Sequence, residues 1–236
     1  MSNCLVAMLG APEPRRLIAR LRAVGVTPDV VHLTADDGLP EADWDGIALV
    51  GGPVSPYDER TVSFHPIGLV LAGAVARQIP TLGIGGGGHL LARALGARPT
   101  TPRTPLPPGI RALTRTAHGR LDRLFRHAPP SPAWVECSGL AYTDLPVGSH
   151  VLAVDESGLP QAVRFGPGAW GFQGHPEMDA DTVEACRGAG YCDDADEAFV
   201  DELAAMTGEL DEIGARWDPM LEEFGSLVAA RTSAGG

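Results

Sequence analysis

The stretch from Ile79 to Ala97 constrains the fold of this chain more than any other. An apolar run ends in four consecutive glycines, Gly85 to Gly88, and an apolar segment rich in alanine, leucine and arginine follows directly. This order predicts a buried strand, a very tight turn and the start of a helix. Such a turn presents a nucleophile at its apex or offers backbone N–H groups to an anion. The apex residue is Gly85, which has no side chain that could attack a substrate.

Hydrophobic periodicity places this turn in a chain of alternating strands and helices. Strands are predicted at residues 4–9, 30–33, 46–50 and 81–84, and helices at 15–24 and 67–77. Because parallel strands need helical crossovers, this alternation predicts an α/β fold with a mostly parallel central sheet and helices on both faces. Ligands bind at the carboxyl ends of such strands, so the glycines at 51–52 and 85–88 are expected to meet at one site.

The second half of the chain carries shorter strands and a long acidic tail. Further strands are predicted at residues 111–116, 151–154, 161–165 and 170–173, and the proline-rich stretch 99–108 is expected to be a surface connector. Apolar residues recur at helical spacing from residue 181 to 230. We therefore expect one domain over residues 1–180 and a helical C-terminal extension over 181–236 that packs on the same domain.

Composition excludes several classes of function. The net charge of −12 argues against a nucleic-acid partner, and the absence of lysine excludes lysine Schiff-base chemistry. The four cysteines have no CxxC spacing, so neither a metal site nor a disulfide framework is expected, and no cofactor is indicated. The chain contains no apolar run of the roughly 20 residues that a membrane helix needs, and no signal-peptide pattern. These features predict a cytoplasmic protein that does not enter a membrane.

His175 and Glu177 are candidates for acid–base chemistry. They lie two residues apart after a predicted strand, so both side chains are expected on the same face. A carboxylate beside an imidazole fixes the tautomer of the ring and stabilises the imidazolium. The glycine pair at 51–52 ends another strand, and backbone amides at such a turn can hold an oxyanion. Taken singly, each motif also fits an ordinary loop or turn.

Taken together, three segments resemble the class I glutamine amidotransferase family, whose members use a Cys-His-Glu triad. The segments are IALVGGPVSPYDE, PTLGIGGGGHLLARALG and WGFQGHPE, in the order and spacing of that family. The resemblance runs from about Val6 to about Met178 and is strongest to stand-alone members related to the glutaminase part of GMP synthetase. It implies a flavodoxin-like three-layer sandwich and the release of ammonia from glutamine through a thioester.

The resemblance also implies roles for individual residues. His175 matches the general base and Glu177 its orienting partner, while Gly52 and Gly86 match the donors of the oxyanion-hole amides. Tyr57 belongs to the matching loop, which borders the substrate pocket. Neighbouring residues in that loop and on the histidine strand match as well, namely Asp58, Trp170 and Gln173.

The sequence departs from the family at three places. Gly85 stands where the family has its nucleophilic cysteine, and His89 stands where the family has a glutamine that helps to hold the substrate. The segment 137–144 lacks the His-Gly-Asp sequence that lines the pocket in close relatives. No thioester can form at Gly85, and Cys137 is the one other thiol expected near the pocket, although a cysteine without a role is the commoner case.

Three hypotheses follow from these departures. The first is a repurposed enzyme in which His175 and Glu177 act on a glutamine-like or other small carbonyl compound, with His89 as a second acid or base. The second is a non-catalytic ligand-binding protein or regulatory subunit of a synthetase partner. The third is a conventional glutaminase in which glycine replaces the native cysteine at position 85. Because three places differ at once, natural loss of the thiol is favoured, and whether the chain is an enzyme stays open.

Overall fold

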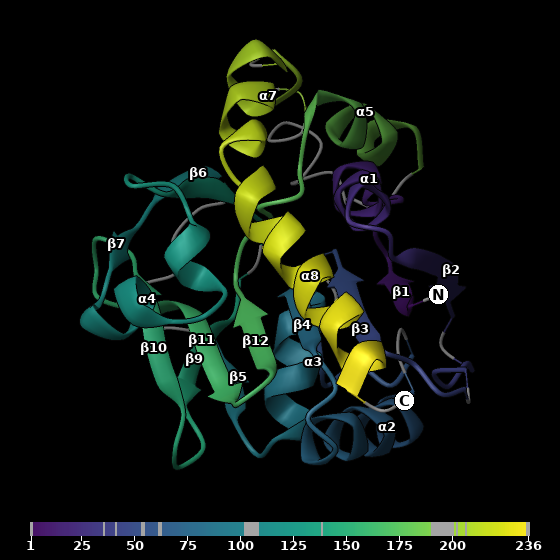
Figure 1. Ribbon diagram of the computed structural model, residues 1–236. Helices are drawn as coiled ribbons and strands as arrows, with labels where there is room; N and C mark the ends of the chain where they lie inside the picture. Colours follow the sequence, from purple (N-terminus) through teal and green to yellow (C-terminus); the bar gives the residue numbers. More distant parts are fainter. Residues whose placement is uncertain are drawn as a thin grey trace.

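The computed structural model describes residues 2–34, 36–40, 42–52, 55–60, 63–101, 109–137, 139–189, 201, 203–205 and 207–234. Its centre is an eight-stranded sheet with the strand order β2-β1-β3-β4-β12-β11-β10-β7 (Figure 1). In this order the strands span Thr27–Leu33, Asn3–Leu9, Gly46–Gly51, Thr81–Gly85, Ala169–Phe172, Pro160–Gly166, His150–Val154 and Thr114–Arg115. Strands β2 to β12 pair in parallel, and the pairs beyond β12 are antiparallel. The sheet is therefore mostly parallel where the predicted site lies.

Helices cover both faces of this sheet. Helices α1 (Arg15–Ala23) and α8 (Asp218–Ala234) pack on one face, and α2 (Phe64–Ala76) and α3 (Gly86–Ala94) pack on the other. Because side chains alternate along a strand, Cys4 of β1 joins the core under α1 and α8, while Leu5 joins the core under α2 and α3. Figure 1 shows α8 crossing the front of the sheet. The predicted flavodoxin-like three-layer sandwich is confirmed.

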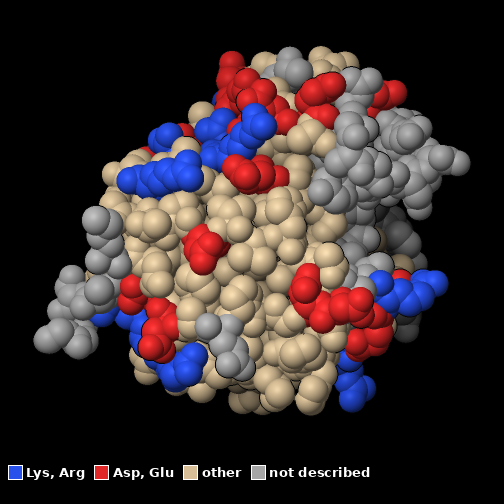
Figure 2. Space-filling view, turned by 90° about the vertical axis from the view of Figure 1, so that its right-hand side faces the viewer, with Lys and Arg blue, Asp and Glu red and all other residues tan. Residues whose placement is uncertain are grey.

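The C-terminal tail is helical and packs on the domain. It contains α5 (Ala180–Ala189), α7 (Thr207–Ala215) and α8. Arg16 Nη1 lies 3.1 Å from Asp218 Oδ1, and Trp217 Nε1 donates to Ala133 O at 2.7 Å. Oppositely charged side chains accordingly lie next to each other along the top of the face in Figure 2. The division at residue 180 stays a prediction, and residues 190–200 of the expected helical tail lie outside the described residues.

The structure differs from the predicted pattern in the second half of the chain. The strand predicted at 111–116 is two strands in different sheets, β6 (Gly109–Ala112) and β7, because Leu113 turns into the core between them. Strand β6 pairs with β8 (Ala133–Glu136), and β5 (Arg98–Thr100) pairs with β9 (Ala141–Asp144). These added strands have three or four residues each, too few for a periodic signal. Residues 102–108 of the predicted connector lie outside the described residues.

No helix in the described part of the chain is long and apolar enough to cross a membrane.

Candidate functional site

The glycine run forms a tight elbow between β4 and α3. Gly85 ends β4 with φ of 56° and ψ of −127°, a backbone conformation that L side chains rarely adopt. The next glycines allow α3 to lie directly on the sheet. A Cβ added at Gly87 would lie 2.0 Å from Leu49 O, and one at Gly83 would lie 2.7 Å from Gly88 Cα. Gly87 in α3 and Gly83 in β4 are therefore required by the close approach of the two backbones.

The two glycine-rich strand ends meet at this elbow, as the sequence predicts. Gly51 of β3 is the register partner of Gly85. A Cβ added at Gly85 would lie 2.5 Å from Gly51 O and 2.5 Å from His175 Nε2. The imidazole of His175 and the carbonyl of Gly51 thus occupy the space that a side chain at position 85 would need.

His175 and Glu177 form a buried pair beside the elbow. His175 Nδ1 lies 2.8 Å from Glu177 Oε1, and the two residues are 6% and 1% exposed. A short bridge to β8 holds the backbone, because His175 N–H donates to Val135 O at 2.8 Å. A carboxylate only accepts, so Nδ1 carries the proton of the neutral ring and Nε2 keeps its lone pair. The lone pair is on the nitrogen that lies beside Gly85.

The two predicted oxyanion donors differ in their surroundings. The N–H of Gly52 donates to Leu9 O at 3.0 Å, so it continues the β1–β3 ladder in this structure. Gly86 is the first residue of α3, and amides of the first helical turn have no acceptor inside the helix. These amides also carry the positive end of the helix dipole. An oxyanion beside His175 would therefore be stabilised by the start of α3.

His89 lies behind the elbow in a buried network. Its ring is fully buried, and His89 Nε2 donates to Gln173 Oε1, whose amide nitrogen donates to Leu140 O at 2.6 Å. Burial lowers the pKa of His89 to about 4; the hydrogen bond with Gln173 opposes this shift and the nearby His175 adds to it. His89 is therefore neutral near pH 7. Through Gln173 it connects α3 to Leu140, which lies in the segment 137–144 that departs from the family pattern.

Tyr142 completes this buried network and was missed by the sequence reasoning. Its ring packs edge-on against His89 with centroids 5.3 Å apart, and burial raises the pKa of Tyr142 well above its usual value. Its hydroxyl and His89 Nδ1 have no hydrogen-bond partner among the described residues. The available signal was the position of Tyr142 in the segment 137–144, which departs from the family pattern.

The loop after β3 is attached to α3 through Arg93. The Arg93 guanidinium lies 5.0 Å from the centroid of the Tyr57 ring and donates to Pro56 O. Tyr57 itself is 46% exposed, which is compatible with its predicted place at the border of a pocket. Sequence reasoning missed Arg93; its position four residues after His89, one turn along the helix, was the available signal.

The remaining thiol candidate lies in an apolar cluster that shares Val135 with the backbone bridge to His175. Cys137 is half-buried and packs against an apolar cluster that contains Val135, Met178 and Val183. No group of three or more histidine, cysteine or acidic side chains that could hold a metal ion occurs within the described ranges.

Comparisons with known proteins agree with the geometry. A model of the family described as glutamine amidotransferase class-I matches residues 14–185. The chain is 27% identical over 184 residues to a glutamine-hydrolysing GMP synthase of Chlorobium luteolum, covering 75% of this chain and 34% of the relative. It is 28% identical over 182 residues to that of Pyrobaculum aerophilum, covering 75% and 33%. The chain thus spans about a third of the length of the curated relatives it matches.

Solved structures share the whole fold. A glutamine amidotransferase from Methylobacillus flagellatus superposes with a TM-score of 0.76 at 20% identity, covering 98% of this chain and 95% of that one. A glutamine amidotransferase from Thermotoga maritima gives a TM-score of 0.71 at 21% identity, covering 98% of each chain. At these identities the likeness shows the fold alone.

Proposed function

Because the chain belongs to the class I glutamine amidotransferase family, we propose that it is a modified member that acts on a small carbonyl compound without a covalent intermediate. His175 is the general base in this proposal, and Glu177 orients it. The observation that carries the proposal is the buried hydrogen bond of 2.8 Å between His175 Nδ1 and Glu177 Oε1, with Nε2 beside the elbow. A pair built in this way is suited to acid–base catalysis without a thiol.

The proposed step is hydrolysis by an activated water. His175 Nε2 takes a proton from water as the water oxygen bonds to the substrate carbonyl carbon, and the carbonyl oxygen becomes an oxyanion near the Gly86 amide. The imidazolium then returns the proton to the leaving group as the bond to that group breaks. Glu177 stays ionised throughout and stabilises the imidazolium. His89 acts as a positioning residue rather than as a second acid, because its buried ring has a pKa of about 4.

Without a thiol at position 85, the chain lacks the nucleophile for a thioester route. A covalent nucleophile divides a difficult step into two easier ones, and its loss typically costs several orders of magnitude in rate. The space beside Gly85 is occupied by the His175 ring and Gly51 O, so a thioester route has neither the atom nor the room. Glutamine hydrolysis at the rate of a conventional glutaminase is therefore not expected.

The test is turnover of a panel of amides, esters and lactones of small carboxylic acids, glutamine included, by the purified chain. We expect His175→Ala to lower kcat/KM for the accepted substrate by about 10²–10⁴-fold. Glu177→Gln is expected to reduce it too, because the ring loses its orienting acceptor. His65→Ala serves as the control, since His65 is exposed on α2. Unchanged turnover in His175→Ala, or a covalent adduct with a diazoketone mimic of glutamine, would contradict the proposal.

A second candidate is a non-catalytic subunit that binds a ligand or a synthetase partner. Two observations favour it: the filled space beside Gly85, and the length of the GMP synthase relatives, of which the chain spans about a third. Co-expression with the remaining part of a GMP synthase tests it. Under this alternative His175→Ala leaves the complex intact, while a bulky residue in place of Gly86 removes ligand binding. The third possibility, a replaced cysteine, is decided by the native codon at position 85.

A further inference from the structure

A hollow lies at the amino ends of strands β3 and β4, opposite to the elbow at their carboxyl ends. It has a volume of about 510 Å³, and its lining includes Ile47 near the start of β3, Ile79 just before β4, and one side of α2. The same two strands end at Gly51 and Gly85, so the hollow and the candidate active site lie at opposite ends of β3 and β4. None of the residues assigned to the elbow lines it. The hollow is therefore a separate feature that the proposed chemistry does not explain.

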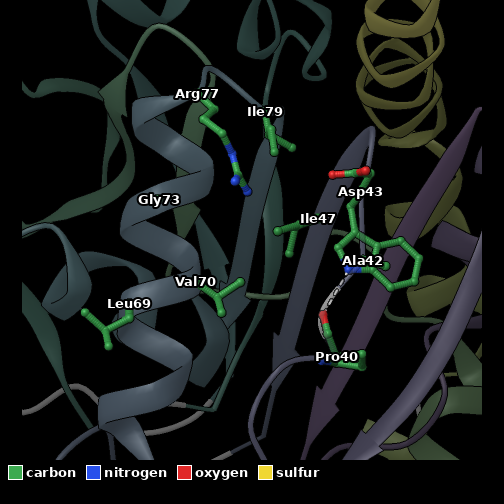
Figure 3. Close-up of a pocket in the computed structure, with 10 residues that line it drawn as sticks. Pro40, Ala42, Asp43, Ile47, Leu69, Val70, Gly73, Arg77 and Ile79 are labelled. Carbon is green, nitrogen blue, oxygen red and sulfur yellow. Dashed lines mark hydrogen bonds between the residues drawn. The ribbon is translucent and has the colours of Figure 1, made fainter.

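The walls of the hollow are apolar and well supported. Ile47 and Ile79 are buried at its floor, and Val70 contributes from α2 (Figure 3). The opposite wall is formed by Pro40, Ala42, Asp43 and Trp44, and Trp44 Nε1 donates to Pro40 O at 3.2 Å. That hydrogen bond keeps the indole in the wall. The volume lies within the range of about 300–1,000 Å³ that is typical of small-molecule sites.

Two opposite charges stand at the rim. Figure 3 shows the Arg77 side chain coming from the end of α2 and the Asp43 carboxylate on the facing wall. Both residues are exposed, and neither makes an ion pair with another residue in the described part of the chain. In contrast, most of the arginine side chains that have a described partner are paired with carboxylates, such as Arg16 with Asp218 and Arg20 with Glu222. Among the described residues, the rim thus offers one cation and one anion without an ion-pair partner above an apolar floor.

We propose that this hollow binds a small zwitterion with an apolar body, of the class of apolar α-amino acids. A guanidinium matches the geometry of a carboxylate with two parallel N–H donors, which suits Arg77 to the ligand carboxylate. The Asp43 carboxylate accepts from the ligand ammonium group. Ile47, Val70 and Ile79 take the apolar side chain, which leaves water as it enters. A ligand with only one of these charges would leave the other rim group unmatched.

Gly73 allows the hollow to be closed without disturbing the fold. It lies on α2 facing the hollow, and a Cβ added there meets nothing within 4 Å (Figure 3). Its φ is not in the left-handed region, so a side chain is compatible with the helix. Gly73→Phe therefore fills the space with a ring, whereas Gly73→Ala leaves most of it open and raises helix propensity.

The experiment is calorimetric titration of the full chain with L-phenylalanine and with L-leucine. The comparison probes are 3-phenylpropionate, which lacks the ammonium group, and phenethylamine, which lacks the carboxylate. We expect saturable binding of at least one amino acid at millimolar or lower concentration, and binding weaker by about tenfold or more for each comparison probe. Gly73→Phe is expected to abolish binding and Gly73→Ala to retain it.

The charge variants assign the two rim groups. Arg77→Gln should weaken amino-acid binding by about tenfold or more and leave the binding of phenethylamine, which has no carboxylate, unaffected. Asp43→Asn should likewise weaken amino-acid binding by about tenfold or more and leave the binding of 3-phenylpropionate, which has no ammonium group, unaffected. Arg22→Gln is the matched control, since Arg22 is an exposed arginine on α1, away from the hollow. Failure of both amino acids to bind, equal binding by Gly73→Phe, or equal affinity for a singly charged probe would overturn the proposal. All of these readouts are independent of turnover at the elbow.

Discussion

The substitution Gly85→Ala tests how closely the elbow is filled. It adds a single methyl group at a residue with φ of 56°, where a non-glycine residue costs about 1–3 kcal/mol in backbone strain. The added Cβ would lie 2.5 Å from Gly51 O and 2.5 Å from His175 Nε2. Gly51 O belongs to a backbone held in the β3–β4 ladder, so it cannot move cheaply. Overpacking of this kind costs a further amount of about 1–3 kcal/mol.

The two contributions together predict a loss of about 2–6 kcal/mol in the free energy of unfolding. For a chain of this length, that corresponds to a fall of about 4–24 °C in Tm. Urea unfolding followed by tryptophan fluorescence measures the loss, and calorimetry gives the Tm. The four tryptophans make the fluorescence signal strong.

Two controls separate backbone strain from steric contact. Gly96 has φ of 93° with nothing within 4 Å of an added Cβ, so Gly96→Ala reports the strain alone. In a His175→Ala background the ring is absent, so Gly85→Ala should cost less there than in the wild type by about 0.5–3 kcal/mol. If Gly85→Ala costs no more than Gly96→Ala, or if the two substitutions at 85 and 175 are additive, the space beside Gly85 is not filled as described.

Two further predictions concern the buried network, and one concerns the elbow. The pKa of His89 is lowered to about 4 in the folded chain, against about 6.5 in the unfolded chain. Between about pH 4 and about pH 6.5 the imidazole is therefore protonated in the unfolded state and neutral in the folded state. The contribution of His89 to the free energy of unfolding is fully present above pH 6.5 and falls by about 3 kcal/mol as the pH drops through 4. In His89→Gln, the urea midpoint should lose this pH dependence between about pH 7.5 and 4.5. An unchanged pH dependence in that variant would contradict the lowered pKa of His89. Tyr142→Phe removes a buried hydroxyl that has no hydrogen-bond partner among the described residues, so we expect a change within about 1 kcal/mol, and a loss above about 3 kcal/mol would show that the hydroxyl is bonded. Gly85→Cys is expected to yield no glutamate from glutamine, because the His175 ring stands in the way of the thiol; stoichiometric glutamate and ammonia would instead support a replaced cysteine.

The glycine elbow and the histidine–glutamate pair were predictable from sequence, and for a local reason. A strand that breaks into four glycines and continues as an apolar helix has few other conformations, and the period of a strand puts His175 and Glu177 on one side. The parallel sheet was predictable from the alternation of strands and helices, because helical crossovers between strands allow only a few strand arrangements. The short strands β5, β8 and β9 were not predictable, because pairing with distant segments, rather than their own composition, makes them strands.

The environment of each side chain was decided by the tertiary structure. The family resemblance put His89 at the position of a substrate-holding glutamine, and only the packing of α3 against β12 showed that it is buried against Gln173 with a lowered pKa. Gly52 was predicted as an amide donor, but pairing of β1 with β3 gives its N–H to Leu9 O. The rim charges Arg77 and Asp43 lie 34 positions apart in the chain and only the sheet brings them to one hollow. Sequence determines which groups exist and their local periodicity, while burial, dielectric and partner geometry arise only when distant segments are packed together.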